Sequence, residues 1–382
     1  MGEIAYMAEG LEGVVAAATR LSDVDGERGR LTIAGYAVEE LAPHAAFEDV
    51  AYLLLNGRLP DADAAARFRE DLAARRALPP TTIDVVSDAA RTEASPMAAL
   101  RMAAARLSLG RPEEPLGDAM TAIAAMPAIV GAYWRVRQGA AAVPVRSDLS
   151  HAAHCLHQLF GEAPTAERAR GLETYLNTVC DHGMNASTFT ARVIVSTHSD
   201  VISAITGAIG ALKGPLHGGA PGPALEMVFE IGDASHADAF IRAKLDRGER
   251  LMGFGHRVYR VRDPRADVLA RAAERFYASD GDRRLYQLAT DVEQTALRLL
   301  RERKPDRPIQ TNVEFYTALL LHGLGVPVDL FTPVFAIGRV AGWAAHCLEQ
   351  LRDGRLIRPQ STYVGPTGRS LGRATPQGHL VN

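Results

Sequence analysis

The sequence predicts a mainly α-helical protein of more than one folding unit, with a short β hairpin near the N-terminus. Apolar residues recur at three- and four-residue spacing along most of the chain, a pattern typical of helices with one buried face. Alanine is abundant and favours helix, and Gly or Pro follows many of these segments, where a helix must end. A chain of 382 residues is long enough for two or more folding units.

Seven segments carry the helical spacing most clearly. They are residues 45–56, 62–76, 97–108, 165–180, 186–197, 200–212 and 333–351. Residues 30–38 (RLTIAGYAV) have the β-branched residues and the central Gly expected of a short strand pair. Polar content rises between about residues 233 and 310, which loosely marks a smaller and more charged unit.

The composition of the chain limits the classes of binding partner and the cellular compartment that we expect. The net charge of −3 gives no global reason to expect nucleic acid, so an anion site must be a local cluster of Arg or Lys. Cys155, Cys180 and Cys347 are far apart without zinc spacing, so each is expected to be a small buried side chain in a reducing compartment. The N-terminus lacks the apolar core of a signal peptide, and apolar stretches such as 336–345 are interrupted and judged too short to cross a bilayer. We therefore expect no membrane partner and a cytoplasmic location.

Two histidines lie in glycine-containing turns. His217 lies in LKGPLHGGAP (212–221), where the small neighbours let a ligand approach the backbone. Taken alone, this segment is better explained as a helix-terminating turn with an incidental His. His256 follows a Gly-x-Gly turn in MGFGHRVYRVRDPR (252–265), and the segment that follows it contains Arg257, Arg260, Arg262 and Arg265. Guanidinium groups beside a His suit recognition of phosphate or carboxylate, although four arginines also occur on solvated faces.

Further polar residues stand out at helix ends or inside apolar helices. His182 lies in a polar turn before a helix that begins near Asn185 or Ser187. Asn312 and Glu314 open another helix, where a cap and an acidic first turn account for them without any catalytic role. Arg339 interrupts an apolar helix, and a buried charge there requires a partner or a ligand.

Three histidines repeat at three-residue spacing on a predicted helix. His151, His154 and His157 drift around the helix, and no carboxylate or cysteine nearby completes a ligand set. We therefore expect no metal site here.

The order and spacing of these segments resemble those of the citrate synthase family along nearly the whole chain. The matching segments are GLEGV (10–14), DGERGRL (25–31), FEDVAYLLLNGRLP (47–60), DHGMNASTFTARV (181–193), ALKGPLHGGA (211–220), GFGHRVYRVRDPR (253–265), NVEFY (312–316), FAIGRVAGWAAHCLEQ (335–350) and RLIRPQS (355–361). The resemblance implies a two-domain, multi-helical fold and a homodimer of the shorter bacterial and archaeal kind. It places a large helical domain at 1–218 and 325–382 and a small helical domain at 219–324.

The resemblance also implies a role for each site residue. His217 would hydrogen-bond the thioester oxygen, Glu314 would remove the methyl proton, and His256 would polarise the ketone of the oxo acid. The residues implied to hold the oxo acid are His182, Arg265, Arg339 and, from the other subunit, Arg358. Those implied to contact coenzyme A are Arg260, Lys304, Arg307 and Asn312. No permanently bound cofactor is expected, because acetyl-CoA or propionyl-CoA is a co-substrate.

The chain departs from the family pattern at several positions. Glu314 stands where the family normally has Asp, Pro221 replaces the Asn of HGGAN, and Ala34 replaces a frequent Arg. The first interpretation is a citrate synthase that uses acetyl-CoA and oxaloacetate. One alternative is a 2-methylcitrate synthase that uses propionyl-CoA, because one methylene changes discrimination by only about 1–3 kcal/mol. Another is a weakly active or inactive paralogue that binds oxaloacetate or coenzyme A as a regulatory subunit.

Overall fold

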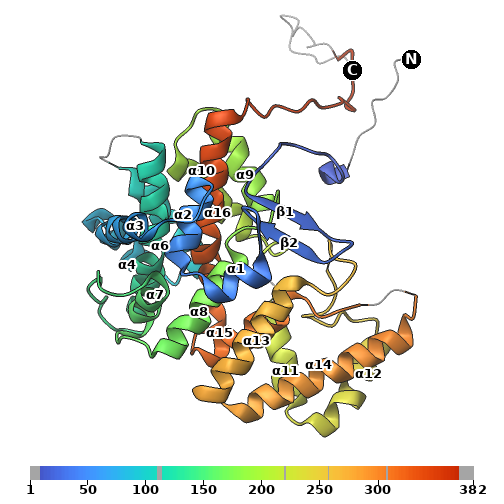
Figure 1. Cartoon of the computed structure of the whole chain (residues 1–382). Helices are drawn as coiled ribbons and strands as arrows, with labels where there is room; N and C mark the ends of the chain where they lie inside the picture. The colour runs from blue at the N-terminus through green and yellow to red at the C-terminus, as the bar shows by residue number, and fades with distance from the viewer. Residues whose placement is uncertain (1–8, 110–113, 219–220, 257, 307–308, 370–382) are drawn as a thin grey trace, which may run out of the picture.

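The computed structural model describes residues 9–109, 114–218, 221–256, 258–306 and 309–369. Helices dominate the structure, and the larger group of them surrounds one long helix (Figure 1). A small sheet lies beside this group, and a second, smaller group of helices lies below both in that view.

The described residues form sixteen α-helices and one three-stranded sheet. The strands are β1 (Ser22–Asp25), β2 (Arg30–Ile33) and β3 (Tyr36–Ala37). The helices are α1 (Val38–His44), α2 (Phe47–Asn56), α3 (Ala62–Ala74), α4 (Pro80–Arg91), α5 (Pro96–Ala105), α6 (Pro115–Arg137), α7 (His151–Phe160), α8 (Ala166–Val179), α9 (Ala186–Val195), α10 (Val201–Leu212), α11 (Pro221–Ile231), α12 (Ala237–Asp246), α13 (Pro264–Ser279), α14 (Arg283–Arg303), α15 (Val313–Gly323) and α16 (Phe331–Asp353).

The mainly α-helical fold class is confirmed, and the seven predicted helices are all present. Their ends agree to within a few residues, because the chain carries clear start signals. Ser150, Thr165, Asn185 and Asp200 each accept a backbone N–H three residues later and so begin α7, α8, α9 and α10. Asn185, rather than Ser187, is the cap of α9.

Helices α6 and α16 are apolar on all sides and form the centre of the larger group. Helix α16 packs against α6, α9, α10, α2 and α8.

The prediction that the apolar stretches are too short to cross a bilayer is wrong, because two helices have the necessary length. Within the described residues, Pro115–Arg137 and Val328–Asp353 pass a length and composition test for spanning. Their most apolar windows are 89% and 78% buried inside the protein, as in the core helices of a folded domain.

Two glycines let α16 approach the end of α8 closely. A Cβ at Gly338 would lie 2.9 Å from the carbonyl oxygen of Leu176, and one at Gly342 would collide with the backbone of Cys180. Such contacts require glycine, because any side chain would force the helices apart. This packing brings Arg339, between the two glycines, against the segment that leads into His182.

The sheet has one strand more than the sequence predicts. Strand β2 pairs with β3 across a two-residue turn, Ala34-Gly35, in which both residues have positive φ, as tight hairpins require. The additional strand, β1, pairs antiparallel with β2. Its sequence, SDVD, has only one apolar residue, so the alternation that identifies strands is missing.

Helices α11 to α15 form the smaller group. Helix α13 packs on α15, α11 on α15, and α12 on α14. This group also meets the larger one, because α13 packs against α8 and α1. The loop before α13 reaches the sheet, where Arg260 donates its backbone N–H to the Gly26 carbonyl (2.9 Å).

Candidate active site

The candidate site lies where the two helical groups meet. His182 immediately precedes α9 in the larger group, and His256 precedes α13 in the smaller one. Their ring centroids are 6.0 Å apart, and Tyr259 lies against both rings. The Tyr259 hydroxyl and His182 Nε2 share a hydrogen bond of 3.1 Å. Burial lowers the pKa of His182 well below its ordinary value, and the charges of Arg265 and Arg339 lower it further.

The backbone determines the tautomer of His256. Nδ1 accepts the N–H groups of Val258 (3.0 Å) and Tyr259 (3.1 Å), and a backbone N–H can only donate. The positive φ of Gly253 and Gly255 shapes the turn that makes this possible. Burial lowers the pKa of His256 to about 4, so the ring is neutral and carries its proton on Nε2.

The Nε2–H of His256 faces a second donor. Arg265 places a guanidinium nitrogen 3.2 Å from Nε2. Two donors cannot satisfy each other, but a carbonyl or carboxylate oxygen placed beside both would accept from both. Asp263 holds Arg265 in place through both carboxylate oxygens, at 3.0 and 2.8 Å. Burial disfavours the charged guanidinium, but Asp263 outweighs burial and raises the pKa of Arg265.

Arg339 supplies a second buried guanidinium. Its Nε donates to the Val179 carbonyl (2.6 Å), and the group lies over the Phe335 ring at 4.6 Å. Among the described residues no carboxylate forms an ion pair with it within 4.0 Å, and burial lowers its pKa to about 10, although the charge of Asp181 partly opposes this. A buried charge without an ionic partner is costly, so this position suits an anionic ligand.

His217 has the opposite tautomer from His256. The backbone N–H of Ser187, in the first turn of α9, donates to His217 Nε2 (3.3 Å), and the Ser187 hydroxyl lies 2.8 Å away. Trp343 in turn donates to that hydroxyl at 3.0 Å. Burial lowers the pKa of His217 to about 4. The neutral ring therefore carries its proton on Nδ1, where it can be donated to a developing oxyanion.

Glu314 lies in the first turn of α15, next to the His256 segment. Asn312 caps this helix by accepting the Glu314 N–H (2.9 Å) and donates its own amide to the Gly255 carbonyl (2.8 Å). Burial raises the pKa of Glu314, while Arg265 opposes that rise. A carboxylate with a raised pKa is a stronger base than an exposed one.

The remaining predicted residues do not join this cluster. Arg358 is exposed in the segment after α16, where the Ile357 N–H donates to Ser196 at the far end of α9 from Ser187 (3.0 Å). That segment runs away from the body of the protein (Figure 1). Arg260 and Lys304 are exposed, and Arg260 lies 3.9 Å from Glu27. Arg307 lies outside the described residues.

Sequence reasoning missed several residues that orient the site. Tyr259, Asp263, Ser187 and Trp343 all lie inside segments that were recognised, but the sequence does not identify their partners. Asp263 and Ser187 carried local signals, because an Asp before Pro264 is typical of a helix start and Ser187 was a candidate cap for the helix after His182.

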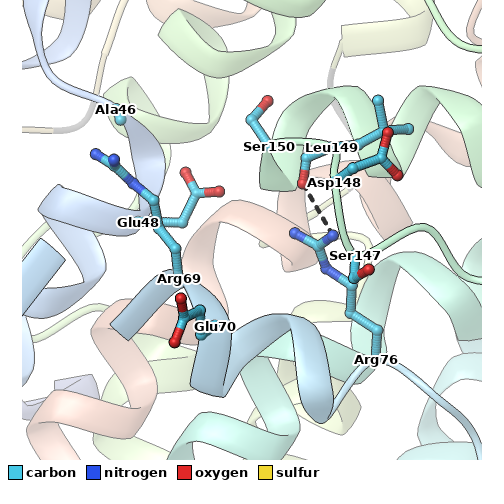
Figure 2. Close-up of a pocket in the computed structure, with 9 residues that line it drawn as sticks. All are labelled: Ala46, Glu48, Arg69, Glu70, Arg76, Ser147, Asp148, Leu149 and Ser150. Carbon is cyan, nitrogen blue, oxygen red and sulfur yellow. Dashed lines mark hydrogen bonds between the residues drawn. The ribbon is translucent and has the colours of Figure 1, made fainter. Parts of the chain in front are cut away.

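A separate cavity of about 310 Å³ lies beside α2 and α3 and contains none of the site residues (Figure 2). There the Arg76 guanidinium donates to the carbonyls of Arg146 (2.5 Å) and Leu149 (2.9 Å), which anchors the loop before α7. The His151 and His154 rings are buried with no hydrogen-bond partner for their nitrogens. In the described part of the chain, no three His, Cys, Asp or Glu side chains are grouped to hold a metal ion.

The fold brings neutral histidines, buried arginines and a partly buried carboxylate together, a set of groups that suits an enzyme acting on a small anionic carbonyl compound. The family profile described as "Citrate synthase, C-terminal domain" matches residues 10–360. The chain belongs to the citrate synthase family.

Individual proteins of this family are similar to the chain over nearly its whole length. The citrate synthase of Haloferax volcanii is 41% identical over 93% of this chain and 95% of its own length. The 2-methylcitrate synthase of Shewanella oneidensis is 38% identical over 95% and 96%. The crystal structure of citrate synthase from Pyrobaculum aerophilum has a TM-score of 0.87 at 37% identity and covers 96% of this chain and 94% of that one. Citrate synthase from Thermoplasma acidophilum, in a ternary complex with carboxymethyl coenzyme A and oxaloacetate, has a TM-score of 0.86 at 33% identity, covering 96% and 98%.

Proposed function

We propose that the chain condenses acetyl-CoA with oxaloacetate and hydrolyses the resulting thioester to citrate and coenzyme A. The observation that carries this proposal is the pair of complementary histidine tautomers. His217 offers Nδ1–H and His256 offers Nε2–H, and each ring is neutral and held by backbone N–H donors. The reaction has two carbonyl oxygens that gain negative charge, so it requires two such donors.

In this mechanism Glu314 takes a proton from the methyl group of the thioester while His217 donates to the thioester oxygen. The enol that forms attacks the ketone carbon of oxaloacetate, and His256 donates to the oxygen that becomes the alkoxide. The new carbon–carbon bond gives a citryl thioester, and water then cleaves that thioester to release coenzyme A. Arg265, Arg339 and His182 hold the carboxylates of the oxo acid.

The assembly and the coenzyme A contacts are part of the proposal. Arg358 is exposed and distant from the cluster, which supports its donation to the site of a second copy in a homodimer. Arg260, Lys304, Arg307 and Asn312 are proposed to contact coenzyme A. Residues 219–324 are proposed as a small domain that closes on the large domain at 1–218 and 325–382. Three buried free cysteines support a reducing, cytoplasmic location.

The second candidate is condensation of propionyl-CoA to 2-methylcitrate, which the likeness to the Shewanella oneidensis enzyme favours. A thiol-release assay with acetyl-CoA and with propionyl-CoA, each with and without oxaloacetate, separates the candidates. Oxaloacetate-dependent release with a higher kcat/KM for acetyl-CoA supports the proposal. A preference for propionyl-CoA selects the second candidate. No release with either thioester contradicts both and leaves a binding or regulatory role.

A further inference from the structure

Two chain segments of the smaller helical group carry site residues, and short backbone pairing joins them. Phe254 and Thr311 form an antiparallel bridge. Beside it, Gly255 donates its N–H to the Gln310 carbonyl (2.7 Å) and Asn312 donates to the Gly253 carbonyl (2.9 Å). Segment 253–265 contains His256 and Arg265, and segment 310–316 contains Glu314. Two paired residues a side are a weak connection on their own, because short isolated strand pairs are only marginally stable.

One buried carboxylate from a third element braces both segments. Glu293 lies on α14, distant in sequence from every site residue, and is 7% exposed. Its Oε1 accepts from the Thr311 hydroxyl (2.5 Å) and from the Arg262 guanidinium (3.1 Å). Its Oε2 accepts from the Tyr316 hydroxyl (2.5 Å).

Each of the three residues that donate to Glu293 lies in one of the two segments and close in sequence to a candidate site residue. Thr311 precedes the cap residue of α15, and Tyr316 follows Glu314 by two residues. Arg262 lies between His256 and Arg265 on the other segment. An ionised carboxylate only accepts hydrogen bonds, so all three donors must point at it, and charge-assisted bonds of this kind are among the strongest in proteins.

We infer that Glu293 is a positioning residue that holds Glu314 at its working distance from the His256 and Arg265 segment. The inference rests on the proposed function, because it assigns Glu293 to the proton-removal step of that reaction. Misplacement of a reacting group by about 1 Å can cost on the order of 100-fold in rate. Proton removal should therefore slow when the brace is weakened.

The test compares two identical substitutions on the same helix. Glu293→Gln keeps the shape but replaces one acceptor oxygen with a donor and removes the charge that faces Arg262. Glu302→Gln is the matched control, because Glu302 is an exposed acid on α14 whose only described ion pairs, with Arg242 and Arg298, lie on the surface. We expect Glu293→Gln to lower kcat by roughly 10- to 100-fold, with a KM for oxaloacetate within about threefold of the parent. The control should retain parental values.

An isotope effect separates positioning from general loss of structure. With acetyl-CoA carrying a trideuterated methyl group, Glu293→Gln should show a larger primary isotope effect on kcat than the parent, because proton removal becomes slower relative to the other steps. Equal kcat and equal isotope effects in the two Gln variants of an active enzyme would overturn this inference alone. A parent that does not condense acetyl-CoA with oxaloacetate would overturn the proposed function and this inference with it.

If Glu293→Gln fails to fold, variants that each remove one hydrogen bond to Glu293 test the inference instead. Tyr316→Phe and Thr311→Val each remove one hydrogen bond to Glu293 and leave the carboxylate with two donors. Each should lower kcat by about 3- to 10-fold with a raised isotope effect, and their effects should not add, because they act through one group. Parental kcat and isotope effects in both variants would overturn the inference.

Discussion

Glu314 occupies a position that either a catalytic base or a simple helix-start acid would fill. Burial raises the pKa of its carboxyl, and the charge of Arg265 and a hydrogen bond with Asn312 oppose this rise only in part. A helix-start acid is normally exposed, because its carboxylate gains from water as well as from the helix dipole. The half-buried setting beside His256 therefore favours a base.

Replacing Glu314 tests this assignment directly. Glu314→Gln should lower kcat by about 10²–10⁴, since Gln keeps the shape but takes no proton at neutral pH. Calorimetry should show that oxaloacetate still binds. Turnover equal to that of the parent would mean that the base lies elsewhere.

Glu314→Asp reveals how the site accommodates the longer side chain. A rate above that of the parent would mean that the extra methylene misplaces the carboxylate, and a lower rate would mean that the pocket has adjusted to Glu.

Two buried arginines, one with an ion-pair partner and one without, allow a comparison of what a buried charge costs in folding free energy. Arg339 has no carboxylate partner within 4.0 Å among the described residues, whereas Arg192 pairs with Glu349 at 2.7 Å. Arg339→Met should raise the unfolding midpoint or leave it unchanged, because it removes an uncompensated buried charge. It should also weaken oxaloacetate binding by at least about tenfold. Arg192→Met leaves Glu349 buried and unpaired, so it should destabilise the protein by about 3–5 kcal/mol.

Thermal unfolding and calorimetry on both variants check these opposite signs. Equal destabilisation by the two substitutions would contradict the idea that the Arg339 charge serves to bind an anionic ligand.

At the residue scale, the sequence indicates which side chains could take part in the reaction better than it indicates which residues they contact. The family resemblance, rather than local pattern alone, implied site roles for His182, His256, Arg265 and Glu314, and in the structure these residues lie where the two helical groups meet. Glu293 was not predicted, because its three donors come from segments between 18 and 31 residues away. A lone Glu on a helix carries no local sign of burial.

At the element scale, helix α7 contains buried groups that resist protonation. Burial lowers the pKa of His154 to about 3 and that of His151 well below its ordinary value, and the Arg76 charge adds to both shifts. His157 also faces His154, Glu48 accepts the backbone N–H of His151 (2.7 Å), and Asp148 lies in the loop before α7 near His157. The unfolded chain binds protons to these histidines below about pH 6.5 and the folded chain does not. Stability should therefore fall as the pH drops from about 6.5 toward 3.

The His154→Leu variant measures this contribution. At pH 5 the neutral His154 should cost about 2 kcal/mol relative to pH 7.5, so the variant should lose that much less stability over the interval. Urea unfolding at both pH values gives the comparison, with His236→Leu, at an exposed histidine, as the control. The same loss in parent and variant would show that His154 does not remain neutral in the folded protein.

Two of the elements that the sequence did not predict, α6 and β1, have a physical explanation. Helix α6 is apolar on every side and contains Pro127, so it has neither a periodic stripe nor an uninterrupted helical composition. Strand β1 has one apolar residue and forms because β2 presents an edge to it. The amphipathic helices α13 and α14 were not among the seven predicted segments either, although Asp263 and Asp282 cap them as polar residues cap α7 to α10.

At the scale of the whole molecule, the sequence predicts the helical fold, but residue patterns alone place the domain boundary only loosely. Polar content rises over a broad region, and helices of both groups have similar caps. The assembly is likewise invisible to periodicity, since an exposed Arg before a Pro, as at Arg358, occurs on many surfaces.

Composite active sites predict complementation between two inactive variants. Arg358→Ala and His256→Ala homodimers should each be nearly inactive. Mixing with subunit exchange should restore about a quarter of parental activity, because half of the dimers are hybrids and each hybrid has one intact site. Native mass spectrometry verifies that hybrids form. Hybrids that form and remain inactive would show that Arg358 does not act in a neighbouring subunit.

The position of the oxo-acid residues predicts an order of binding. His182 and Arg339 lie on the larger helical group, whereas His256 and Arg265 lie on the smaller one, so one small anion bound between them would contact both. We expect such a ligand to favour a closed arrangement of the two groups, and the proposed acyl-CoA site to be complete only when they are closed. Calorimetry should show acetyl-CoA binding at least about tenfold more tightly with oxaloacetate present, a coupling of about 1.4 kcal/mol. In Arg339→Met this enhancement should shrink, because the ligand loses a contact on one side of the interface. Equal acetyl-CoA affinity with and without oxaloacetate in the parent would contradict closure driven by the oxo acid.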